Sequence, residues 1–99
     1  MTESEIQKSI IEWLKDKHIF HWRNNVGMGR HHVYFGLKGS ADILGILPDG
    51  RFLAIECKSA TGKQSPEQLV FQDNVTANNG LYILAFTLED VKMALAGRR

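Results

Sequence analysis

Asp42, Glu56 and Lys58 are the residues whose types and spacing point most directly to chemistry. The segments that carry them, 41–47 and 51–59, are apolar on both faces and predict two neighbouring strands of a covered β-sheet. Two carboxylates that face each other across such strands destabilise the sheet. A divalent cation removes this repulsion and takes the carboxylate oxygens as ligands. A structural ion pair between Lys58 and Glu56 is the alternative interpretation.

The turn between the two strands determines how they pair. Residues 48–50 are Pro-Asp-Gly, which are strong turn formers, and proline cannot donate a hydrogen bond to a β-ladder. If the turn consists of these residues, Asp42 lies directly opposite Glu56, with Cβ atoms about 4.5–5.5 Å apart. Lys58 lies two residues beyond Glu56 and points to the same face. A two-residue turn would shift the pairing by one residue and weaken this geometry.

The remaining segments predict an α/β fold. Thr2 or Ser4 could cap a first helix, and Ser65 followed by proline begins a second. The order α-β-β-β-α-β-α predicts a mixed central sheet flanked by helices on both faces. The expected elements are a helix at 2–17, a strand at 19–26, a glycine-bearing loop at 27–32, a short extended piece at 33–40, strands at 41–47 and 51–59, a helix from 66 to about 79 that stops at Gly80, a buried strand at 81–86, and a last helix capped by Thr87 with Asp90.

Length and composition are those of one globular domain. The chain has 99 residues, of which 43% are hydrophobic and 23% charged, enough for one core. No apolar run approaches the roughly 20 residues that cross a bilayer, and no signal-peptide pattern is present, so we expect a cytoplasmic protein. The single cysteine, Cys57, excludes an intrachain disulfide and is expected to be a buried small hydrophobe pointing away from Glu56.

Basic residues are concentrated in one part of the chain. The net charge is only +1, but no acidic residue lies between Asp16 and Asp42. This stretch predicts positive potential toward a polyanion such as a nucleic-acid backbone. Chance depletion of acids in a solvated loop is the alternative. The basic residues and histidines of the stretch are Lys17, His18, His21, Arg23, Arg30, His31, His32 and Lys38.

A third carboxylate is expected on the first helix. At about 100° per residue, Glu3 and Gln7 project near the centre or edge of the apolar face that Ile6 and Ile10 define. Glu5 points away from that face and is expected to be a capping or solvent residue. We therefore predict that Glu3 is the helical carboxylate of the site and that Gln7 supports it.

Five short motifs follow one another along the chain: Glu3–Gln7, Gly39–Asp42, Ile55–Lys58, Gly62–Lys63 and Ser65–Gln68. In this order and spacing they resemble the VRR-NUC form of the PD-(D/E)XK nucleases, over about residues 3 to 86. Each motif alone is weak, and the ordered set is more specific. Ala41 departs from the pattern, since the family usually has proline before the aspartate.

The resemblance implies a restriction-endonuclease-like fold and a Mg²⁺- or Mn²⁺-dependent deoxyribonuclease that leaves a 5′-phosphate and a 3′-hydroxyl. It implies that Asp42, Glu56 and the main-chain carbonyl of Cys57 are metal ligands, and Glu3 aligns with the family's helical glutamate. Lys58 would orient or activate the attacking water and offset charge in the transition state.

Several candidate residues allow two interpretations. Gln68 belongs to the catalytic residues of the resembled family, although its third position after Ser65 also makes it an ordinary capping partner. Trp13 and Trp22 are expected in the core more than as platforms on which bases stack. The adjacent His31 and His32 would point apart in a strand, which makes them a poor metal pair.

Residues 1–99 are therefore expected to form one nuclease domain. Family membership points to branched DNA, such as four-way (Holliday) junctions, and no base-reading module is recognisable. One site cuts one strand, so symmetric cutting predicts a homodimer or higher homo-oligomer, and the small size suggests a phage enzyme acting in the bacterial cytoplasm. A non-catalytic DNA-binding module and a metal-free structural domain are the alternatives. DNA contacts are expected from Arg23, Arg30, His31, Lys38 and Lys63.

Overall fold

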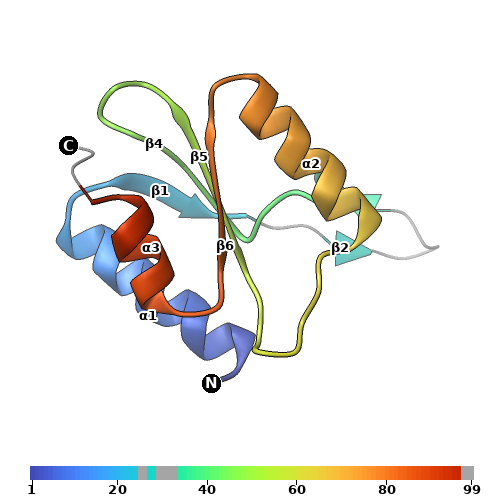
Figure 1. The fold of residues 1–99 in the computed structure, drawn as a ribbon, viewed down its shortest axis with the longest axis horizontal. Helices are drawn as coiled ribbons and strands as arrows, with labels where there is room; N and C mark the ends of the chain where they lie inside the picture. The colour runs from blue at the N-terminus through green and yellow to red at the C-terminus, as the bar shows by residue number, and fades with distance from the viewer. Residues whose placement is uncertain (25–26, 29–33, 97–99) are drawn as a thin grey trace.

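A four-stranded mixed sheet organises the fold of this computed structural model, which describes residues 1–24, 27–28 and 34–96 (Figure 1). The strand order is β1-β4-β5-β6, antiparallel except for the parallel pair β5–β6. Helices α1 and α3 lie on one side of the sheet and α2 on the other. The elements are α1 (Glu3–Asp16), β1 (Phe20–Arg23), β2 (Gly27–Met28), β3 (Tyr34–Phe35), β4 (Ile43–Ile46), β5 (Phe52–Cys57), α2 (Pro66–Ala77), β6 (Leu81–Ala85) and α3 (Leu88–Ala94).

The predicted order of helices and sheet strands is confirmed, with one addition. Residues 27–28 pair with residues 34–35 as a separate two-stranded ribbon, where we expected a loop and a short extended piece. Two glycines near these strands favour a loop prediction, because glycine is depleted in strands. Within the described ranges, no helix is long and apolar enough to span a membrane.

The β4–β5 hairpin has the predicted register. Ile43 pairs with Ile55 and Leu44 with Ala54, and the N–H of Leu47 donates to the carbonyl of Arg51 at 2.9 Å. The turn is therefore residues 48–50, and its last residue, a glycine, adopts a φ of 89° that side chains disfavour. Because side chains alternate along a strand, this register decides which residues reach each face of the sheet.

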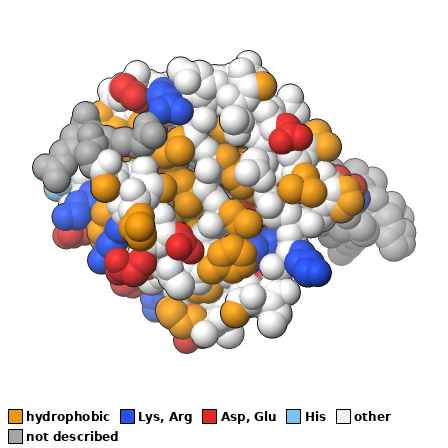
Figure 2. Space-filling model, viewed as in Figure 1, with side chains coloured by type: hydrophobic (Ala, Val, Ile, Leu, Met, Phe, Trp, Pro, Cys, Tyr) orange, Lys and Arg blue, Asp and Glu red, His pale blue; other side chains and the backbone are white. Residues whose placement is uncertain are grey.

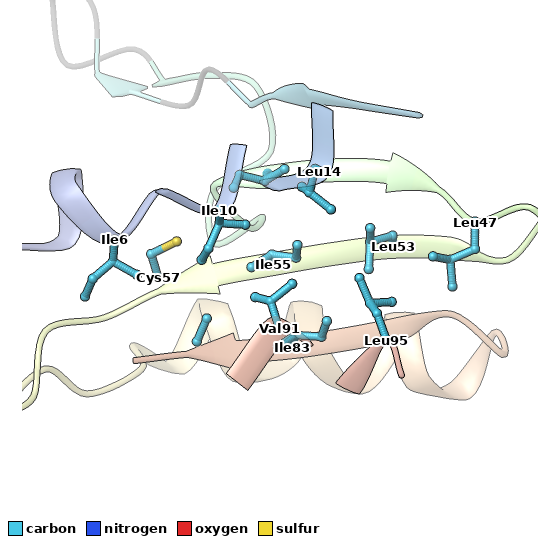
Figure 3. Close-up of a cluster of buried hydrophobic side chains, with 12 residues drawn as sticks. Ile6, Ile10, Leu14, Leu47, Leu53, Ile55, Cys57, Ile83, Val91 and Leu95 are labelled. Carbon is cyan, nitrogen blue, oxygen red and sulfur yellow. The ribbon is translucent and has the colours of Figure 1, made fainter. Parts of the chain in front are cut away.

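The larger hydrophobic core lies between the sheet and the α1–α3 pair (Figure 3). The predicted helical spacing of α1 buries Ile6, Ile10 and Leu14 against the odd-numbered residues of β5 and against Val91 of α3. A second, smaller cluster lies under α2 and consists of Ala41, Ala54 and Val75 with Leu44, Phe71 and Tyr82 packed against it. Glu56 alternates with Cys57 and shares the face of Ala54, and Asp42 lies directly before β4, close enough to Glu56 to raise its pKa.

Capping residues set where the helices begin. Thr2, Ser65 and Thr87 each accept a hydrogen bond from the backbone N–H three residues on, forming three capping boxes. Helix α2 ends at Ala77, two residues before the predicted end, because Asn79 already adopts a left-handed φ of 64°. The caps at Ser65 and Thr87 are confirmed, and Thr2 rather than Ser4 caps α1.

Candidate active site

Asp42 lies directly before β4, where a main-chain hydrogen bond holds its carboxylate in place. Its Oδ2 accepts a hydrogen bond of 2.8 Å from the N–H of Cys57 on the neighbouring strand. Gly39 precedes it with a φ of 88°, and a Cβ there would lie 2.6 Å from the main chain of Glu67 in α2. Only glycine fits this approach without displacement, so the loop before Asp42 packs directly on the beginning of α2.

Glu56 is the buried carboxylate of the α2 face, with 3% of its surface exposed. Its Oε2 lies 3.4 Å from Nζ of Lys58 and accepts a hydrogen bond of 3.1 Å from Nε2 of Gln68. Both contacts fall on the same oxygen, so among the described residues Oε1 is left for a ligand. Gln68 also accepts the capping bond from the N–H of Ser65 through Oε1, so its predicted capping role is confirmed, and it contacts Glu56 at the same time.

Burial and mutual repulsion make this carboxylate pair costly to ionise. Burial and the neighbouring Asp42 raise the pKa of Glu56 to about 7, against the opposing effect of Lys58. Burial likewise raises the pKa of Asp42, and its hydrogen bond from Cys57 only partly offsets this. A site that holds two carboxylates in this way disfavours their charged forms unless positive charge is supplied.

The sequence led us to expect Glu3 beside Asp42 and Glu56, but the structure does not bring the three carboxylates into one group. Oε2 of Glu3 instead accepts a hydrogen bond of 3.4 Å from the N–H of Ser59, just beyond β5. Within 1–24, 27–28 and 34–96, no three or more His, Cys, Asp or Glu side chains are close enough to share a metal ion. The exposed first turn of α1 brings Glu3 to the rim of the site, near enough to raise the pKa of Asp42 and Glu56. Glu5 caps the helix as predicted.

The donors present fit a divalent cation of the magnesium type. Mg²⁺ is usually held by one or two carboxylates, with water and substrate phosphate filling its other positions. Asp42 and Glu56 supply two carboxylates, each with one oxygen outside the hydrogen bonds and ion pairs described above. A cation there would reverse the electrostatic cost of the pair. A closed cage of protein ligands is not required for this class of ion.

Cys57 and Gln7 take the positions that alternation and helical spacing predict. The thiol of Cys57 is buried in the larger core, on the opposite face from Glu56, and burial raises its pKa to about 12. It is therefore no nucleophile. Gln7 is partly buried one helical turn after Glu3.

Three polar residues near Asp42 and Glu56 were not predicted from the sequence. Asn24 donates from Nδ2 to Oγ of Ser40 at 2.7 Å and to the carbonyl of Ala41 at 2.8 Å, which anchors the chain before Asp42. Gln64 donates to the hydroxyl of Tyr82 at 3.2 Å. Burial raises the pKa of Tyr82 to about 12. Strand alternation could have placed Tyr82 on this face, whereas nothing local marks Asn24 or Gln64.

The predicted DNA contacts are dispersed. Arg23 ends β1, and Lys63 is exposed in the loop before α2. Lys38 lines a hollow of about 230 Å³ with Pro66, Glu67 and Val70. Arg30 and His31 lie outside the described residues. On the face shown in Figure 2, Lys and Arg side chains lie among Asp and Glu side chains and do not form one basic surface.

The fold has a solved counterpart. The chain matches no protein-family model and no curated protein. A solved structure described as a VRR_NUC domain superimposes with a TM-score of 0.72 over 100% of both chains, at 18% sequence identity. Asp42, Glu56 and Lys58 thus lie on a scaffold that is shared end to end with that domain, and the chain has the VRR_NUC fold.

Proposed function

We propose that this chain is a metal-dependent endonuclease that hydrolyses phosphodiester bonds in DNA, with residues 1–99 acting as one nuclease domain. The observation that carries the proposal is the pair of the buried Glu56 and the partly buried Asp42, with Lys58 beside it. A structural ion pair needs one carboxylate, and the second raises the cost of burial. The VRR_NUC fold supports the same conclusion.

Asp42 and Glu56 would hold Mg²⁺ or Mn²⁺, with the carbonyl of Cys57 a further proposed ligand and Glu3 at the rim. Such an ion would polarise the phosphoryl oxygen and lower the pKa of the attacking water. Lys58, whose side chain is 12% exposed, places a positive charge beside the pair, where it offsets negative charge that develops on the phosphoryl oxygens. Gln68 fixes the orientation of the Glu56 carboxylate from α2.

The substrate is proposed to be branched DNA, such as a four-way junction, cut by a homodimer. Apart from the short β2–β3 ribbon, the described residues add no element to the sheet and its three helices, which favours recognition of DNA shape. Two copies of one site would allow symmetric cutting of two strands. Arg23, Arg30, His31, Lys38 and Lys63 are the proposed contacts to the phosphate backbone.

The proposal is tested by incubating the protein with labelled four-way junction, flap, duplex and single-stranded DNA, with Mg²⁺, Mn²⁺ or EDTA. We expect cleavage with either ion and none in EDTA, with branched substrates cut faster than duplex. Binding of DNA without cleavage under all conditions would contradict the proposal and favour the non-catalytic module. Sizing of the protein–junction complex by light scattering tests the proposed dimer in the same samples.

A further inference from the structure

An exposed apolar surface continues from the candidate active site toward the β1 edge of the sheet. We call it the β1 patch; its residues and exposed fractions are Phe20 64%, Trp22 41%, Ile46 44% and Phe52 37%. Phe20 pairs with Ile46 and Ile46 with Phe52, so the three side chains point to one face, and Trp22 joins them two residues along β1. Trp13 packs against the larger core, as expected, whereas Trp22 does not.

The β1 patch lies on the same face as the carboxylate pair. Trp22 pairs with Leu44 in β4, and Asp42 lies two residues before Leu44, directly before that strand begins. A diagonal neighbour of this kind is about 7–8 Å away, which is close enough for one bound strand to reach both places. Helix α2 packs on Ala54 and Tyr82 and leaves the β1 side of the face open. A strand bound at the carboxylates would therefore pass over Trp22.

We propose that the β1 patch binds unpaired nucleobases of the DNA substrate, with Trp22 and Phe20 as stacking platforms. The two rings lie 5.7 Å apart between centroids with planes tilted by 56°, and both remain exposed. Aromatic side chains bind single strands through base stacking, which paired bases inside a duplex do not offer. This inference rests on the proposed function and narrows the proposed branched substrates to those that carry unpaired nucleotides next to the cleaved bond.

The position of the β1 patch argues against a second copy of the chain as its occupant. A protein surface seated on Trp22 would also cover Asp42, its diagonal neighbour, and close the site to DNA. A nucleic-acid strand can occupy both places at once. Three of the four side chains of the patch are aromatic, which suits bases more than phosphates.

The test measures binding of fluorescein-labelled oligothymidylate in EDTA, so that neither metal nor cleavage contributes. The variants are Trp22→Thr, which keeps a strand-forming residue without the ring, Trp22→Phe, which keeps a ring, and the control Met93→Ala, an exposed apolar residue of α3 on the other face. We expect Trp22→Thr to weaken binding about 5- to 100-fold. Trp22→Phe should retain most of the affinity, and Met93→Ala all of it.

Equal affinity of Trp22→Thr and wild type would overturn the proposal, as would a drop from dimer to monomer in Trp22→Thr without loss of oligothymidylate binding. If Trp22→Thr does not fold, Trp13→Phe protein serves instead, because Trp22 is then its only indole. Its emission must be quenched at saturating oligothymidylate, and unchanged emission overturns the proposal. If the β1 patch binds oligothymidylate but wild type cleaves no DNA, the stacking proposal stands and the nuclease proposal is rejected. If wild type cleaves DNA but Trp22→Thr has no effect on binding, the nuclease proposal stands and the stacking proposal is rejected.

Discussion

Replacement of Lys58 by methionine is expected to lower kcat for DNA cleavage by about 10²- to 10³-fold, the usual effect of removing one preorganised group that stabilises transition-state charge. Methionine preserves an unbranched apolar stem. This matters because the stem of Lys58 packs closely on Gly62, where an added Cβ would lie only 3.2 Å from Cδ of Lys58. The loss should therefore fall on the chemical step and leave the affinity for DNA nearly unchanged. Single-turnover cleavage of a labelled junction separates the two quantities.

The chain offers a matched control for this substitution. Lys92 pairs with Glu89 at 3.5 Å, much as Lys58 pairs with Glu56 at 3.4 Å, but on the exposed surface of α3. Lys92→Met removes the same kind of ion pair away from the candidate site and should cleave like wild type. Cleavage by Lys58→Met at the wild-type rate would remove the proposed role of Lys58 and contradict the nuclease proposal.

In metal-free protein, Glu56→Gln is expected to become more stable relative to wild type as the pH rises. The folded pKa of Glu56 is raised from 4.5 to about 7, so the folded state holds a proton that the unfolded state has released between these values. Wild-type stability contributed by this group is thus complete below pH 4.5 and is lost as the pH rises to about 7. Glutamine does not ionise and avoids this loss. The free energy of unfolding of Glu56→Gln, relative to that of wild type, should rise by about 3 kcal/mol between pH 4 and pH 8.

Urea denaturation in EDTA at a series of pH values measures this effect. Glu89→Gln is the control, because the Glu89 side chain is 72% exposed and its substitution should leave the pH profile parallel to that of wild type. A Glu56→Gln profile parallel to wild type would mean that the carboxylate is ionised without cost in the folded protein. The strained pair, and with it the electrostatic reason for a cation, would then be absent.

The β4–β5 hairpin could be predicted in detail because its determinants are local. Residues 48–50 define the turn, and alternation then places Asp42, Glu56 and Lys58 on one face. The helix caps are predictable for the same reason, since each depends on two residues three positions apart. The exposure of Trp22, in contrast, depends on tertiary packing. Alternation predicts its face, but not which part of that face α2 covers.

The position of Glu3 shows the limit of a helical wheel. The wheel correctly separates Glu3 from the capping residue Glu5, because it needs only the direction of each side chain. Whether the carboxylate reaches the strand pair depends on how far α1 is shifted along the sheet, and here it reaches Ser59. The contacts of Asn24 with Ser40 and Ala41 are likewise tertiary, and no local pattern encodes them.

Calorimetric titration with Mn²⁺ tests the central claim most directly, because it asks whether Asp42 and Glu56 share a divalent cation. Asp42→Asn is the variant of choice, since asparagine keeps the shape of the side chain and an oxygen that can accept the hydrogen bond from Cys57. We expect wild type to bind Mn²⁺ and Asp42→Asn to bind it at least tenfold more weakly, about 1.4 kcal/mol. Absence of binding by wild type, or equal binding by both proteins, would contradict the metal site on which the proposed nuclease depends.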